Sequence, residues 1–155
     1  MRTDVLVTGA GPTGLALACQ LSRFGVDCIV IDEKETTTPF SKAIGIQART
    51  LEIYEQIGLA HKLIENGWKA NGVQLVEDGK IRGKIDLADF GKGLSPYPFL
   101  LIAEQGIHEN ILHEYLRSNN KDVSWNTSLE SFIQDEHCVR SKIKKASGET
   151  ETIES

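Results

Sequence analysis

The first 33 residues form an apolar run, a glycine-rich turn, an amphipathic run and a second apolar run. We expect a strand at residues 3–8, a helix at about 12–24 and a second strand at 27–32. In the helical run, an apolar face with i, i+3 spacing suits packing against a sheet; it consists of Leu15, Ala18, Leu21 and Phe24. This order of strand, helix and strand is typical of a parallel βαβ unit.

The middle of the chain is predicted to contain a loop, two helices and a hairpin. Polar and threonine-rich residues 34–41 indicate the loop. Apolar spacing predicts a helix at 48–56 and a short one at 60–66. From residue 72 the period changes to two, and residues 72–87 alternate around a central Asp78-Gly79 pair. That pair between alternating segments is typical of a β-hairpin.

The last third is predicted to return to the parallel sheet and then form an antiparallel meander. Residues 88–98 contain glycines and prolines and indicate a loop, and 99–103 form an extended piece before a helix at about 105–117. A short third strand is expected at 122–125. Residues 129–155 are interpreted as two strands and the beginning of a third. Since this strand stops without a covering element, we expect the chain to be the front of a longer one.

The glycine-rich turn has the spacing and context of a dinucleotide-binding fingerprint. Gly9, Gly11 and Gly14 follow the first strand and open the helix, and Asp32 ends the second strand. In such a turn the first glycine permits the tight bend, the second lets the backbone approach a pyrophosphate, and the third permits close helix–strand packing. The helix N-terminus offers N–H groups to the phosphates, and Asp32 would accept hydrogen bonds from the adenosine ribose. The alternative is that the glycines only make a tight turn.

Composition narrows the choice of partners. A chain of 155 residues with a net charge of −5 fits one domain and shows no basic face, which argues against nucleic acid and anionic membrane. Glycines interrupt the apolar start, so neither a membrane span nor a signal peptide is predicted, and a cytoplasmic location is expected. The three cysteines and four histidines lack the spacing of a zinc site, and we expect no metal. Trp68 and Trp125 are expected to be core or half-buried residues.

Three ordered blocks resemble the FAD-dependent aromatic-ring hydroxylases, the single-component flavoprotein monooxygenases of the para-hydroxybenzoate and phenol hydroxylase type. The first block is residues 4–18 with 30–34, which many flavin and nicotinamide enzymes share. The second is residues 42–58, which contain Ala-Arg-Thr-Leu-Glu, and the third is residues 105–112, with the pattern Gln-x-x-x-Glu-x-x-Leu. The second and third blocks are the more specific. The resemblance implies an α/β, Rossmann-like FAD/NAD(P)-binding fold with a parallel sheet, a β-hairpin insertion and an antiparallel β-meander.

The resemblance also implies cofactor-binding residues. Glu33 competes with Asp32 for the ribose, because the end of the strand is uncertain by one residue. Arg49 would contact the FAD phosphates or ribityl chain and Gln105 the ribityl or pyrophosphate region, although each could instead be an ordinary surface residue. Lys42 stands where the family more often has arginine. The full predicted set is Gly9, Gly11, Pro12, Thr13, Gly14, Asp32, Glu33, Lys42, Arg49 and Gln105. Glu109 is expected to be a structural helix residue or to pair with a nearby basic side chain.

The family's reaction uses NAD(P)H and oxygen to hydroxylate an aromatic substrate at the flavin. The family's later Asp-Gly and Gly-Asp-x-x-His motifs and most of its substrate sheet are missing from residues 1–155, so no catalytic residue is predicted and the chain alone is expected to be inactive. The hairpin at 72–87 would belong to the substrate-domain sheet. One alternative is a stand-alone ADP- or FAD-binding module whose open meander edge is covered, for example in a homo-oligomer. A less favoured alternative is an NAD-dependent Rossmann reductase, which lacks a hydride-transfer motif here.

Overall fold

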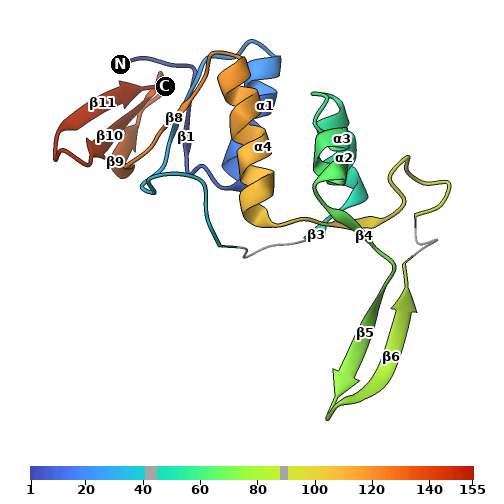
Figure 1. The fold of residues 1–155 in the computed structure, drawn as a ribbon. Helices are drawn as coiled ribbons and strands as arrows, with labels where there is room; N and C mark the ends of the chain where they lie inside the picture. The colour runs from blue at the N-terminus through green and yellow to red at the C-terminus, as the bar shows by residue number, and fades with distance from the viewer. Residues whose placement is uncertain (41–44, 88–90) are drawn as a thin grey trace. The chain divides into compact units, whose positions relative to one another are not determined.

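The computed structural model describes residues 1–40, 45–87 and 91–155, and it divides the chain into two compact units. Unit 1 comprises Met1–Pro39 and Glu109–Ser155, and unit 2 comprises Phe40–His108. Residues 105–108 of helix α4 (Gln105–Ser118) belong to unit 2 and its remaining residues to unit 1. Figure 1 shows the helices and strands of the chain. None of the helices in the described ranges is long and apolar enough to cross a membrane.

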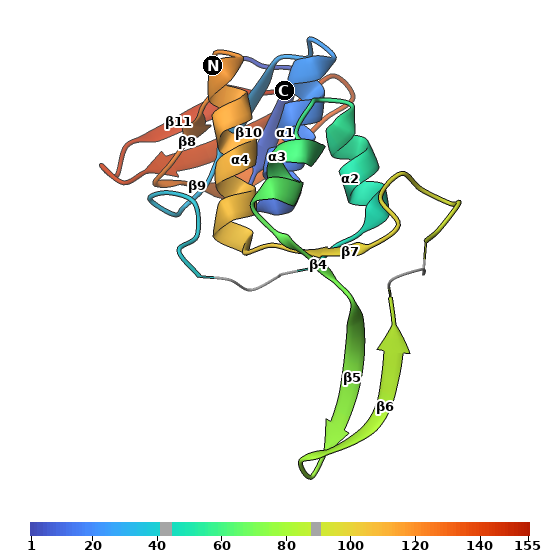
Figure 2. The ribbon, with the colours of Figure 1, turned by 45° about the vertical axis from the view of Figure 1, so that its right-hand side comes forward.

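Unit 1 contains the predicted parallel sheet. Its strands are β1 (Val5–Thr8), β2 (Cys28–Ile31) and β8 (Val123–Ser124), in the order β1-β2-β8. Helix α1 (Pro12–Arg23) connects the first two strands, and it lies beside α4 in both views (Figures 1 and 2). The three strands and the βαβ order predicted from the apolar pattern are therefore confirmed.

Helices α1 and α4 are joined by a hydrogen bond, and each carries fully buried side chains. Leu15 and Cys19 of α1 and Leu112 and Leu116 of α4 are 0% exposed. The Cys19 thiol donates to the carbonyl of Leu112 at 3.4 Å. Burial, with a smaller contribution from Cys28, raises the pKa of Cys19 to about 12. Cys19 is thus a small packing residue, because only a thiolate is strongly nucleophilic.

The meander completes unit 1. It consists of β9 (Thr127–Gln134), β10 (Val139–Lys145) and β11 (Thr150–Glu154), paired antiparallel in the order β11-β10-β9 (Figure 2). Ile143 and Ile153 from the meander pack with Ile31 from β2 in one buried cluster. The predicted meander is therefore confirmed, and its apolar side chains pack against one face of the parallel sheet, where Leu6 and Ile29 also contact the cluster.

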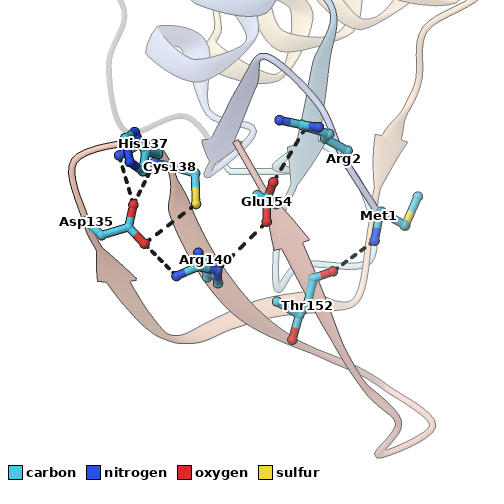
Figure 3. Close-up of polar contacts among 8 residues, drawn as sticks. All are labelled: Met1, Arg2, Asp135, His137, Cys138, Arg140, Thr152 and Glu154. Carbon is cyan, nitrogen blue, oxygen red and sulfur yellow. Dashed lines mark hydrogen bonds and ion pairs between the residues drawn. The ribbon is translucent and has the colours of Figure 1, made fainter.

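The N-terminal residues pair with the edge of β11, a feature that the sequence pattern did not predict (Figure 3). Arg2 forms a parallel bridge with Glu154, the Thr3 N–H donates to the Glu154 carbonyl at 3.1 Å, and the N-terminal ammonium donates to the Thr152 carbonyl at 3.0 Å. Glu154 also lies 3.8 Å from Arg140, whose guanidinium donates to Asp135 at 2.7 Å. An edge that would otherwise attract other strands is thereby covered by the chain itself.

Unit 2 is built around a small antiparallel sheet and two helices. The strands are β3 (Gly45–Ile46), β7 (Leu100–Ile102) and β4 (Trp68–Ala70), in the order β3-β7-β4. The helices α2 (Ala48–Glu55) and α3 (Ala60–Glu65) match the predicted ones. Strands β3 and β4 are too short to give an alternating pattern and were not predicted. The expectation that Trp68 is core or half-buried is wrong: it lies on an edge strand and is 60% exposed.

The predicted hairpin of unit 2 is confirmed as β5 (Gly72–Glu77) and β6 (Lys80–Asp86) (Figure 2). Asp78 and Gly79 both have positive φ, 49° and 72°, as a two-residue type I′ turn requires. Every residue of the two strands is exposed. The predicted loop that follows lies partly outside the described residues, at 88–90, and residues 91–98 contain neither helix nor strand.

Candidate dinucleotide-binding site

The glycine turn between β1 and α1 has a backbone that only small residues permit. Gly9 has φ +100° and donates its N–H to the Ile31 carbonyl at 2.8 Å. A Cβ at Gly14 would lie 1.9 Å from the carbonyl oxygen of Gly9. These glycines therefore bring the start of α1 against the end of β1, as the fingerprint spacing predicts.

The N-terminus of α1 is suited to bind an anion. The N-cap Gly11 provides no side-chain hydrogen bond to the helix, Pro12 lies in the first turn, and this turn contains no acidic residue. The first intrahelical hydrogen bond of the helix runs from the Leu15 N–H to the Gly11 carbonyl at 2.9 Å. N–H groups before that point have no intrahelical acceptor, and they carry the positive end of the helix dipole. A groove of about 420 Å³, lined by residues that include Gly9, Gly11, Pro12, Thr13 and Gly14, runs along this turn.

Asp32 follows β2 and is 7% exposed. Its Oδ2 accepts the Ala10 N–H at 2.6 Å, which ties the carboxylate to the glycine turn, and its Oδ1 accepts the Lys34 N–H at 2.8 Å. A carboxylate offers about four lone-pair positions, so two backbone bonds leave capacity for further donors such as ribose hydroxyls. Glu33 is exposed. Of the two competing acids, Asp32 is thus the one fixed beside the turn.

A second pocket lies at the carboxyl ends of β1 and β2. It has a volume of about 350 Å³, and its lining includes Gly9, Asp32, Glu33, Lys34 and the first residues of β9. The Thr127 N–H donates to the Asp32 carbonyl at 2.9 Å, which holds β9 against this edge. Ligands of open parallel sheets bind outside the carboxyl ends of the strands, and this pocket occupies that place.

Lys34 and Glu109 contribute charges to this site that were not predicted from the sequence. The Lys34 ammonium lies 3.7 Å from Asp32 Oδ2 and 3.8 Å from Glu109 Oε2. Glu109 is 0% exposed and accepts the Thr38 N–H at 2.7 Å. The sequence did contain a signal for the burial of Glu109. This residue lies three residues before Leu112 and seven before Leu116, on the apolar stripe of α4. An acid on such a stripe indicates a buried, partnered carboxylate.

The remaining predicted residues belong to unit 2 or fall outside the described chain. Arg49 lies in the first turn of α2; its side chain is 75% exposed and forms an ion pair with Glu52 at 3.0 Å. A hydrogen bond from Ser95 lowers the pKa of Glu52 the most, and a hydrogen bond from Arg49 lowers it further. Arg49 also lines a largely apolar pocket of about 500 Å³. Gln105 is the first residue of α4, and Lys42 lies outside the described residues.

The described residues therefore bring together one group of the predicted set, the glycine turn and Asp32, in unit 1. Arg49 and Gln105 belong to unit 2. Within the described ranges, no cluster of three or more His, Cys, Asp or Glu side chains could hold a metal ion. The arrangement in unit 1 offers N–H groups for phosphate, a fixed carboxylate for hydroxyl groups and a pocket between them. These are the kinds of groups that bind phosphate and ribose in nucleotide sites.

Comparison with known proteins agrees with this arrangement. A family model described as an FAD binding domain matches residues 2–155. Pentachlorophenol 4-monooxygenase of Sphingobium chlorophenolicum is 35% identical over 150 residues, which are 96% of this chain and 28% of that protein. The flavin-dependent monooxygenase PieE, solved with FAD and substrate, is 26% identical with a TM-score of 0.88 and is covered over 29% of its length.

A further solved structure shows the same fold. The p-nitrophenol 4-monooxygenase PnpA of Pseudomonas putida DLL-E4 has a TM-score of 0.89 at 24% identity, over 99% of this chain and 39% of that one. The chain thus spans less than two fifths of the length of each of these proteins. The α/β fold with a parallel sheet and antiparallel strands, inferred from the sequence pattern and the resemblance, is confirmed.

Proposed function

The chain belongs to the FAD binding domain family, and from that premise we propose that unit 1 holds the AMP half of FAD within a flavin-dependent monooxygenase. The observation that carries the proposal is the hydrogen bond from the Ala10 N–H to the buried Asp32 carboxylate. It fixes a hydroxyl-binding group against the glycine turn, and so sets the ribose and pyrophosphate positions relative to each other.

Each part of the site has a role in this proposal. The Gly9–Gly14 turn, with Pro12 and Thr13 at the start of α1, holds the pyrophosphate through backbone N–H groups. Asp32 accepts the ribose hydroxyls, and the pocket beside β9 takes the adenosine. When bound, FAD supplies the redox chemistry through its isoalloxazine ring. Arg49, Gln105 and Lys42 are proposed to contact the part of FAD beyond the AMP half.

The activity of the complete protein is part of the same proposal. One relative is a pentachlorophenol 4-monooxygenase, which supports an aromatic substrate for the complete protein. We further propose that the complete protein uses oxygen and NADH or NADPH and acts in the cytoplasm. The chain spans 28% of that relative. We therefore propose that residues 1–155 bind cofactor without hydroxylating a substrate. The exposed hairpin face of Val73, Leu75 and Ile85 is proposed to pack into the substrate-binding part of the complete protein.

A calorimetric titration of the chain with FAD, ADP and NAD tests the nucleotide site. We expect saturable binding of FAD and ADP, and about tenfold weaker binding of both to Asp32→Asn, because a hydrogen bond to a charged group contributes about 1.5–3 kcal/mol. The matched control is Asp78→Asn, which removes a carboxylate from the hairpin turn of unit 2, where asparagine also tolerates positive φ.

The outcomes separate the possible roles of the chain. Tighter binding of FAD than of ADP would support contacts beyond the AMP half, and equal binding would show that the AMP half alone is used. Binding of NAD without FAD would contradict the flavin proposal. Equal losses in Asp32→Asn and Asp78→Asn would show that the carboxylate beside the turn has no specific part in binding.

A further inference from the structure

Glu109 is the most deeply buried charged residue among those described in unit 1. Its side chain is 0% exposed, and Oε2 accepts the Thr38 N–H at 2.7 Å. The next residue of α4, Asn110, accepts the Thr37 hydroxyl at 2.6 Å. Adjacent residues of one helix thus hold adjacent residues of the segment that follows β2. This segment carries Lys34, which lines the nucleotide pocket.

The position of the Glu109 charge is unusual for an anion-binding site. Its Oε1 lies 4.0 Å from the position that a Cβ on Gly11 would occupy, so a carboxylate stands beside the turn proposed to hold a pyrophosphate. Uncompensated, it would repel the phosphates, and a buried charge is costly unless it is paired. The Lys34 ammonium supplies the compensation, because it lies between Glu109 and Asp32, at 3.8 and 3.7 Å.

We propose that Glu109 is a positioning residue for the nucleotide site, and this rests on the proposed function. Its carboxylate anchors the segment 34–38 through the Thr38 N–H and holds Lys34 against Asp32. Lys34 in turn neutralises Glu109 beside the glycine turn. Glu109 contacts no ligand in this scheme; it acts through the two residues that it holds.

Two variants of Glu109 test the anchor. In Glu109→Leu the Thr38 N–H loses its acceptor, and we expect faster hydrogen exchange of that amide and about tenfold weaker ADP binding. Glu109→Gln keeps an acceptor oxygen and is expected to retain both protection of the amide and ADP affinity to within about threefold. Glu114→Gln, the same change at an exposed position of α4, is the control. Circular dichroism establishes that each variant is folded at the temperature used.

A double-mutant cycle tests the charge. Lys34→Met leaves two carboxylates without their shared cation, and we expect ADP binding to weaken about tenfold. Adding Glu109→Gln removes one of these charges and is expected to restore part of the affinity, a rescue that loss of packing alone would not give. The proposal is overturned if Glu109→Leu binds ADP as the wild type does, or if the double variant binds no better than Lys34→Met.

Failure of the nucleotide-site proposal gives a different result. The wild-type chain would then bind neither ADP nor FAD, whatever stands at position 109. The hydrogen exchange of Thr38 in Glu109→Leu would still report the anchor, because it does not depend on a ligand. Unchanged exchange in that variant would overturn the anchor irrespective of nucleotide binding.

Discussion

Unit 1 and unit 2 use their residues in different ways. Unit 1 fixes its candidate site with backbone contacts: Gly14 closely approaches the Gly9 carbonyl, and the Asp32 carboxylate accepts two main-chain N–H groups. Unit 2 leaves its candidate residue Arg49 75% exposed and presents a hairpin of which every strand residue is exposed. The proposed nucleotide site of unit 1 is therefore held in place by the main chain, whereas unit 2 presents exposed side chains that are available to further contacts.

This difference indicates which atoms each unit would use to bind a ligand. A glycine turn and a helix N-terminus can bind phosphate with main-chain atoms alone, and their geometry is already formed before a ligand binds. An exposed guanidinium forms a useful contact only when a ligand or another segment limits its motion, because exposed ion pairs contribute little. We therefore expect substitutions in unit 1 to affect folding and binding together, and substitutions in unit 2 to affect them separately.

The largest effect is expected from Gly14→Ala. The added Cβ would lie 1.9 Å from a backbone oxygen of Gly9, so the turn or the helix must move. Such overpacking costs about 3 kcal/mol of unfolding free energy, at the upper end of its usual range. The same shift displaces the N–H groups of the turn, and ADP affinity should fall by at least about tenfold. Urea unfolding and calorimetry measure the two losses.

Gly83→Ala in β6 is the control for that substitution. A Cβ there meets only the Leu75 Cβ at 4.0 Å, an ordinary contact. We expect its free energy of unfolding to stay within about 0.5 kcal/mol of the wild type, as for other exposed positions. If both variants were equally stable, the close approach at Gly14 would not limit the fold, and the contrast between the units would be lost.

The same contrast explains how much the sequence predicts. The Gly9–Gly14 turn and Asp32 are recognisable because one strand, one turn and one helix determine their geometry through local spacing. The hairpin is predicted for the same reason, from Asp78-Gly79 between alternating strands. By contrast, β3 and β4 depend on pairing with the distant β7, and neither has a periodic pattern of its own. The partners of Glu109 and the pairing of Arg2 with Glu154 also depend on long-range contacts.

A smaller, selective effect is expected from Arg49→Met. If Arg49 contacts FAD beyond the AMP half, its loss should weaken FAD binding about fivefold, near 1 kcal/mol, and leave ADP binding unchanged. Arg82→Met is a matched control, because Arg82 also forms an ion pair with a glutamate at 3.0 Å in an exposed part of unit 2. Calorimetric titration of both variants with FAD and ADP measures the difference. If Arg49→Met lost the same affinity for FAD and for ADP, Arg49 would not contact the part of FAD beyond the AMP half.

The smallest effect on stability is expected at the hairpin. Val73, Leu75 and Ile85 share one face, since Val73 is opposite Ile85 and Leu75 follows Val73 by two residues, and they are 50–67% exposed. We expect the Leu75→Thr, Ile85→Thr double variant to change the unfolding free energy by no more than about 0.5 kcal/mol. It should reduce self-association at high concentration, because an exposed apolar face favours contact with other molecules. Sedimentation velocity over a concentration series measures this association.

Gln74→Thr separates the apolar face from a general effect of the substitution, because Gln74 is opposite Lys84 on the other face of the hairpin. This variant is expected to associate as the wild type does. A loss of several kcal/mol in the double variant would instead mean that Leu75 and Ile85 are buried within the isolated chain in solution. The hairpin would then be part of the core of unit 2, and the proposal that its face packs into the rest of a longer protein would fail.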